Sequence, residues 1–174
     1  AMPHNKVPRF THTFLIYDAD TLPSRYRGKL FGVAPLLSHV VLSEVTANGS
    51  SFRTHDVGHP VTTDDPWFRP VDIKLGADGA LYVADWDDRQ TNHYRNHEGQ
   101  IDRTSGRVYR LTAAGAKPVK PFDLSRLPTD DLIGLLNHPN LWYRQTALRL
   151  IGDRKDRSAL PKLTGMVRGG VGQP

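Results

Sequence analysis

The fold class is indicated most clearly by residues 67–86, which read WFRPVDIKLGADGALYVADW. Apolar and polar side chains alternate in both halves of this stretch, as they do in strands with one buried face. The sequence Gly-Ala-Asp-Gly between the halves is typical of a tight turn. The stretch therefore predicts two short antiparallel strands joined by a hairpin turn, a pattern typical of one blade of a β-propeller. The apolar positions that alternate are Val71, Ile73, Leu75, Leu81 and Val83.

Further strands are predicted on both sides of this hairpin. Residues 47–50 read Ala-Asn-Gly-Ser, which predicts a second hairpin turn. Residues 13–57 are expected to form one blade and residues 71–111 most of the next, with a long excursion at residues 87–105. The predicted fold class is mainly β, with about two antiparallel β-propeller-type blades followed by a short α-helical HEAT-like segment. The strand candidates outside the first hairpin are residues 13–17, 29–33, 39–45, 51–57 and 106–111.

The hydrophobic periodicity changes after residue 128. Residues 112–128 contain three prolines and are expected to be a linker. Apolar residues then recur at helical spacing, with helix starts expected at Thr129 and Ser158 and a helix end at Gly152. This arrangement is similar to a single HEAT repeat, which cannot bury its own apolar face. The predicted domains are a partial propeller at residues 1–120 and a linker with a HEAT-like repeat at residues 121–174.

Length and composition restrict the function classes. A blade takes about 40 to 50 residues and a closed ring needs at least four, so 174 residues are too few for a whole propeller. We therefore expect a homo-oligomer or a part of a larger multidomain protein. The absence of cysteine excludes disulfides, thiolate metal sites, cysteine nucleophiles and Cys-x-x-Cys-His haem attachment. No apolar run reaches membrane-spanning length, and the N-terminus has no signal-peptide hydrophobic region.

The formal charge of +5 is concentrated at the C-terminal end. Basic residues after residue 139 alternate with apolar positions at helical spacing, and no base-stacking aromatic residues lie between them. Nucleic-acid binding is therefore not favoured, and a solvated helix face is the preferred interpretation.

Arg69 is the first candidate site residue, because it enters a predicted inner strand. A guanidinium near a propeller axis could bind a cofactor or substrate carboxylate through two parallel hydrogen bonds. The alternative is a structural arginine that ties loops together through Asp64 or Asp65.

The excursion supplies the second candidate site. Two histidines in it are spaced i, i+4 and could hold a divalent metal, calcium or zinc, with nearby carboxylates. The order His-x-x-x-His-Glu differs from the protease arrangements, in which Glu lies between the histidines. The alternative is a loop held by hydrogen bonds. The metal-ligand candidates are Asp85, Asp87, His93, His97 and Glu98, and Arg95 is a cofactor-binding candidate together with Arg69.

The third candidate site is the sequence Thr-His-Asp-Val-Gly-His-Pro at residues 54–60. His59 lies between Gly58 and Pro60 and could point into the same cleft as His97. Asp56 could orient a histidine or act as a carboxylate base. Hydrogen-bonded loop histidines are the alternative. No Gly-x-Ser-x-Gly sequence exists, so a standard serine esterase is not favoured.

Four motifs together resemble a specific bacterial group. They are DDPWFRPVD at 64–72, DGALYVADW at 78–86, NHYRNHEG at 92–99 and GRVYRL at 106–111. The stretch is similar to the propeller of large secreted planctomycete proteins, often called membrane-bound dehydrogenase-type or haem-binding-domain proteins. The resemblance implies a propeller followed by HEAT-like repeats, often a c-type cytochrome module, and a secreted or periplasmic location.

A weaker similarity extends to the soluble sugar dehydrogenases, which hold pyrroloquinoline quinone on a propeller axis. In those enzymes an arginine at a place similar to that of Arg69 contacts the cofactor, so the resemblance implies the same role here.

Two classes of function follow. The first is a binding or scaffold module for a carbohydrate or a redox partner. The second is an enzyme that uses His59, Asp56, Arg69 and His97, either for quinone-linked oxidation of a sugar or for metal- or carboxylate-assisted hydrolysis. Two blades cannot supply all the cofactor contacts of a sugar dehydrogenase unless the chain oligomerises. We therefore favour the binding function.

Overall fold

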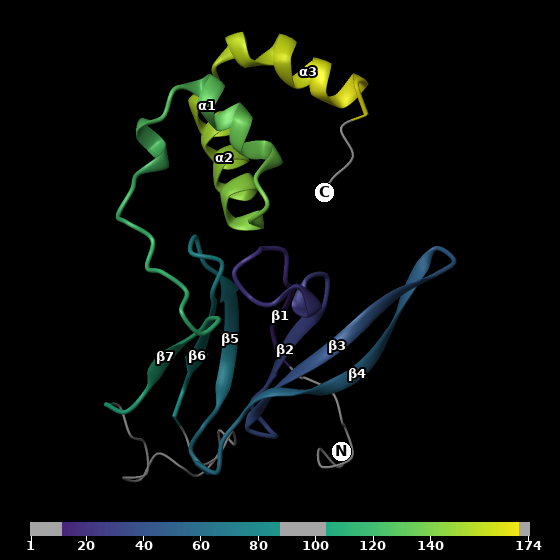
Figure 1. Ribbon diagram of the computed structural model, residues 1–174, viewed down its shortest axis with the longest axis vertical. Helices are drawn as coiled ribbons and strands as arrows, with labels where there is room; N and C mark the ends of the chain where they lie inside the picture. The colour runs from purple at the N-terminus through teal and green to yellow at the C-terminus, as the bar shows by residue number, and fades with distance from the viewer. Residues whose placement is uncertain (1–11, 88–103, 171–174) are drawn as a thin grey trace, which may run out of the picture.

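Two antiparallel β-sheets followed by short helices make up the protein in a computed structural model, which describes residues 12–87 and 104–170 (Figure 1). Both sheets are simple meanders, in which each strand pairs with the next in sequence. The first sheet contains β1 (Phe14–Ile16), β2 (Leu30–Ala34), β3 (His39–Asn48) and β4 (Ser51–Thr62). The second sheet contains β5 (Pro70–Leu75), β6 (Leu81–Asp85) and β7 (Arg107–Leu111).

The helices lie beyond one end of the two sheets, and the linker from β7 runs alongside to reach them (Figure 1). Asn140 caps α2, because its side-chain oxygen accepts a hydrogen bond from the Trp142 N–H at 2.8 Å. The α-helices are α1 (Thr129–Gly134), α2 (Leu141–Arg154) and α3 (Leu160–Arg168). The short 3-10 helices are η2 (Ser24–Tyr26), η3 (Leu124–Arg126), η4 (Leu135–Asn137) and η5 (Arg157–Ala159).

The predicted strands and the helix start at Thr129 are confirmed, with β1 and β2 within one residue of the expected bounds and β3 extended to Asn48; three further differences follow. The alternation at 67–86 forms β5 and β6, and Asn48 pairs with Ser51 across the predicted hairpin turn. Helix α2 runs to Arg154, past the predicted end at Gly152. The helix expected from Ser158 begins as η5 and continues as α3.

The third difference is in β4, which continues to Thr62, so that His59 lies on a strand and not in a loop as expected. Strand β4 is at the edge of its sheet, a position in which a proline such as Pro60 is tolerated.

The two sheets share one hydrophobic core. Strand β2 of the first sheet contacts β5 of the second, and buried side chains from both sheets form a single cluster. The helices have a separate cluster around Leu132, Ala147 and Ile151. The fold class is thus mainly β with short helices. The core cluster consists of Tyr17, Ala19, Phe31, Val33, Val40, Leu42, Phe68, Ile73, Leu81 and Val83.

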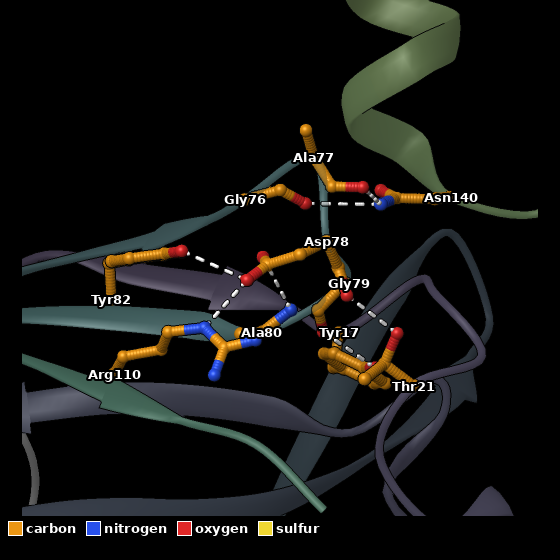
Figure 2. A network of polar contacts seen from close by, with 10 residues as sticks. All are labelled: Tyr17, Thr21, Gly76, Ala77, Asp78, Gly79, Ala80, Tyr82, Arg110 and Asn140. Carbon is orange, nitrogen blue, oxygen red and sulfur yellow. Dashed lines mark hydrogen bonds and ion pairs between the residues drawn. The ribbon is translucent and has the colours of Figure 1, made fainter. Parts of the chain in front are cut away.

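The turn between β5 and β6, residues 76–79, is held by groups from two distant parts of the chain (Figure 2). From the segment after β1, the Tyr17 hydroxyl donates to the Gly79 carbonyl at 2.9 Å, and the Thr21 hydroxyl donates to the Asp78 carbonyl at 2.7 Å. From the start of α2, the Asn140 side-chain NH2 donates to the carbonyls of Gly76 and Ala77, both at 3.0 Å. This turn, referred to below as the 76–79 turn, therefore links the sheets to the helices.

A second contact fixes the helices beside the 76–79 turn. The Leu141 N–H donates to the Asp18 carbonyl at 2.8 Å, and the Asp18 carboxylate forms an ion pair with Arg144 of α2. Arg144 also donates to the His138 carbonyl at 2.7 Å. The first turn of α2 is thus bound to the segment between β1 and β2.

No helix of residues 12–87 and 104–170 combines the length and the apolar character that a membrane span needs.

Replacing Gly79 by alanine is expected to destabilise the fold more than replacing Gly115 by alanine. Both glycines have a positive φ, +72° and +78°, so both replacements incur the same backbone strain. A Cβ at Gly79 would also overlap the Thr21 side chain, whereas one at Gly115 meets no atom of the described residues within 4 Å. We expect Gly79→Ala to lower the free energy of unfolding by about 1–3 kcal/mol more than Gly115→Ala, measured by denaturant titration. Equal losses would contradict the contact between the turn and Thr21.

Candidate functional site

Asp85, a predicted metal ligand, is a buried residue at the end of β6. Its Oδ1 accepts the Arg69 N–H at 2.8 Å and the Asp87 N–H at 3.0 Å. Its Oδ2 is buried and has no hydrogen-bond partner within the part of the chain that the structure describes. Asp87 is also buried, has a φ of +55°, and lies 3.8 Å from Arg107. The carboxylate of Asp85 therefore holds the chain where β5 begins and β6 ends.

Arg69 connects the two sheets through its side chain. Its Nη1 donates to the Ser38 hydroxyl, in the connection between β2 and β3, and to the Phe68 carbonyl at 2.8 Å. Among the described residues it therefore ties loops together, as the structural alternative proposed, but through Ser38 and not through Asp64 or Asp65. Its predicted cofactor-binding role stays a prediction.

Most of the predicted metal site lies outside the described residues. His93, Arg95, His97 and Glu98 all fall within residues 88–103. Within residues 12–87 and 104–170, no group of three or more His, Asp or Glu side chains is arranged to hold a metal ion. The calcium or zinc site predicted with Asp85 therefore stays a prediction.

The predicted residue His59 lies against His39, a residue that sequence reasoning missed. The ring centroids are 4.1 Å apart and the planes are inclined by 43°. Burial and the neighbouring His59 lower the pKa of His39, against a hydrogen bond to the Leu37 backbone that raises it. The pairing of the two predicted strands could have placed these histidines near one another, but a register shift near Val40 sets the actual contact.

Asp56 lies on β4, where its carboxylate accepts a hydrogen bond from the Ser43 hydroxyl at 2.7 Å. Ser43 is opposite Asp56 on β3 and is fully buried. The described contact of Asp56 is thus with a hydroxyl, and its predicted role as a base or as the partner of a histidine stays a prediction.

A polar network that the sequence did not suggest surrounds Asp78 of the 76–79 turn (Figure 2). Its Oδ2 accepts from Arg110 Nε at 2.6 Å and from the Tyr82 hydroxyl at 2.9 Å, while Oδ1 accepts the Ala80 N–H at 3.1 Å. Tyr82 and Arg110 pair on adjacent strands, so the three side chains form one surface of the second sheet. Arg110 lies 32 residues from Asp78, and no local pattern joins them.

This network forms one wall of an open groove of about 430 Å³. The opposite wall is the linker between β7 and η3. The groove therefore combines a carboxylate, a guanidinium, a phenol and an ammonium group with apolar surface. It is lined by Ala77, Asp78, Tyr82, Arg110, Pro118, Val119, Lys120, Pro121 and Phe122.

Aromatic side chains extend the groove toward the helices. Phe122 stacks on Tyr143 at a centroid distance of 5.6 Å and an angle of 20°, and meets Trp142 edge-on at 5.8 Å. Tyr143 also contacts His138, at 4.2 Å. Burial raises the pKa of Tyr143, and the negative charge of Asp78 adds to this effect. The aromatic cluster thus lies within electrostatic reach of Asp78.

The charge of Asp78 is stabilised by its partners. Burial alone would raise the pKa of this carboxyl, but hydrogen bonds from Arg110, the Ala80 N–H and Tyr82 hold the pKa below its usual value of 3.8. A carboxyl whose pKa is lower in the folded chain than in the unfolded chain stabilises the fold. Its full contribution is present at pH values above its pKa in the unfolded chain. That contribution is lost as the pH falls through the folded pKa.

Replacing Asp78 by asparagine is expected to lower the free energy of unfolding at pH 7 by about 1–2 kcal/mol, because charge-assisted hydrogen bonds are lost. The difference from the wild type should shrink as the pH falls below 3.8, the usual pKa of the carboxyl in the unfolded chain, and should be lost as the pH falls through the lower pKa of Asp78 in the fold. Denaturant titrations at several pH values measure this, with Asp64→Asn at an exposed position as the control. A difference that does not change with pH would contradict the charged network.

Comparisons with known proteins identify few relatives. No curated protein matches the chain significantly. Part of this chain is similar to the solved structure of a Thermus thermophilus protein, which is provisionally described as an oxidoreductase (glucose dehydrogenase). The identity is 24%, the match covers 49% of this chain and 22% of that chain, and the TM-score is 0.37. This chain therefore spans about 22% of the length of that protein, and so distant a likeness carries no argument about activity.

A protein-family comparison gives a broader match. The family described as "Domain of unknown function (DUF7133)" matches residues 3–115, which include every described strand of both sheets and end before the α-helices. Since the match covers more than half of the chain, the protein belongs to the DUF7133 family.

Proposed function

We propose that the chain is a binding and scaffold module of a larger protein, and that its groove binds a carbohydrate. The observation that carries this proposal is the groove itself, in which the Asp78 network faces the linker residues Lys120 and Phe122.

The groups that line the groove suit the chemistry of a sugar. A sugar hydroxyl is both a donor and an acceptor, and the groove offers carboxylate and phenol oxygens beside guanidinium and ammonium donors. A sugar ring also has an apolar C–H face, for which an aromatic ring is a suitable surface. Phe122 provides such a ring with 44% of its surface exposed.

The scaffold role is supported by how the helices are attached. Asn140, Leu141 and Arg144 fix the start of α2 to segments that connect strands of both sheets. Apolar side chains stay exposed on the helices, with Leu148 61% and Val167 83% exposed. A further repeat or a partner that covers these side chains would remove that surface from water.

The finer assignments belong to this proposal. The two meander sheets with a common core would be neighbouring propeller-type blades, and residues 121–174 would be a linker with the first HEAT-like repeat. The larger protein would be secreted or periplasmic and could present a redox partner. The quinone-dependent and hydrolytic activities stay predictions, because His97 lies outside the described residues.

Carbohydrate binding is tested by titrating the chain with neutral oligosaccharides and following heat and backbone amide NMR shifts. We expect saturable binding with shifts at residues 77–82, 110 and 118–122, and binding weakened by Phe122→Ala or Lys120→Ala.

Two variants serve as matched controls. Phe52→Ala removes an exposed phenylalanine from the β3–β4 hairpin, and Lys117→Ala removes a linker lysine that does not line the groove. Neither should change binding. Shifts spread over other surfaces, or no saturation at millimolar sugar, would reject the groove as a carbohydrate site.

A further inference from the structure

His39 and His59 form an imidazole pair that the proposed carbohydrate groove does not use. His39 is the first residue of β3, and His59 lies near the end of β4, the strand that pairs with β3. The two ring centroids are 4.1 Å apart. His39 pairs with Thr62, while His59 lies in the register shift between the Val40–Val61 and Leu42–Gly58 pairs, so the ladder fixes the residues on both sides of it.

The Nε2 atom of His39 is buried and has no hydrogen-bond partner among residues 12–87 and 104–170. The Leu37 backbone raises the pKa of His39, as an acceptor beside an imidazole does, and we assign the ring proton to Nδ1 on this ground. A neutral imidazole that donates from Nδ1 to a backbone carbonyl carries its lone pair on Nε2. This is the arrangement found at metal sites, where the second ring nitrogen of a histidine ligand is held by a backbone carbonyl or a carboxylate.

We propose that His39 and His59 bind a divalent transition-metal ion of the zinc class, with solvent molecules completing the coordination. An ion bound to Nε2 would satisfy a buried acceptor that otherwise lacks a partner. Imidazole nitrogens suit zinc, nickel and copper, whereas calcium prefers oxygen ligands. This site differs from the one predicted with His93 and His97, since it shares no residue with it.

Two protein ligands limit how such a site can act. Within residues 12–87 and 104–170, no group of three or more His, Asp or Glu side chains is placed to hold a metal. The remaining coordination positions would be taken by water, and catalytic zinc sites likewise keep a position open to solvent or substrate. The proposed ion is therefore bound less tightly than a closed structural zinc, and its open positions are available to an outside ligand.

The experiment is calorimetric titration of the full chain with Zn²⁺ near pH 7.5, where histidine is neutral. We expect one ion per chain at this site, and at least about tenfold weaker binding in His39→Ala and in His59→Ala. His55→Ala is the matched control, because His55 lies exposed on β4 and pairs with Glu44, away from the end of β3 at which His39 lies. The double variant His93→Ala with His97→Ala removes the histidines of the other predicted metal site, so that Zn²⁺ binding by the two sites can be told apart.

Binding that is unchanged in both single variants, or absent in the wild type, would overturn the proposal. Should the alanine variants fail to fold, the wild-type chain provides a second test with Co²⁺ as a paramagnetic probe. Selective broadening of the imidazole NMR signals of His39 and His59 supports the site. Broadening confined to other histidines overturns it.

Discussion

The carbonyl groups of the 76–79 turn are the acceptors on which the arrangement of the molecule depends. Tyr17 and Thr21 hold the turn from the first sheet, and Asn140 holds it from the helices. The bond from Tyr17 to the Gly79 carbonyl is buried, and a buried carbonyl without a donor costs about 1–3 kcal/mol, whereas the bonds to the other three carbonyls are part-buried and cost less to lose. The turn therefore fixes the sheets relative to one another and fixes the start of α2 relative to both.

The candidate groove depends on the same turn. Asp78 directs its backbone carbonyl to Thr21 and its carboxylate to Tyr82 and Arg110, so the polar wall of the groove is positioned from the turn. The other wall is held through Phe122, which packs on Trp142 and Tyr143 of α2. Because α2 is itself bound to the turn, both walls are set by one short segment. The histidine pair depends only on the register of β3 and β4.

The sequence could predict the elements but not their side-chain partners. The alternation of apolar and polar side chains at residues 71–83 and the hairpin turn at 47–50 depend on residues adjacent in the chain. The sequence therefore predicted both features correctly. The contact of Arg110 with Asp78, and of Asn140 with Gly76, joins residues 32 and 64 positions apart, which no local period encodes. The contact of His39 with His59 was missed because a register shift in the β3–β4 ladder changes which side chains are neighbours.

The most direct test of this account is amide hydrogen exchange of Asn140→Ala, compared with Asn137→Ala at a nearby exposed position. Loss of a helix cap alone would speed exchange only in the first turn of α2. If the 76–79 turn joins the sheets to the helices, exchange should also become faster at the ends of β5 and β6 in Asn140→Ala and stay unchanged in Asn137→Ala. Faster exchange confined to α2 would contradict the account.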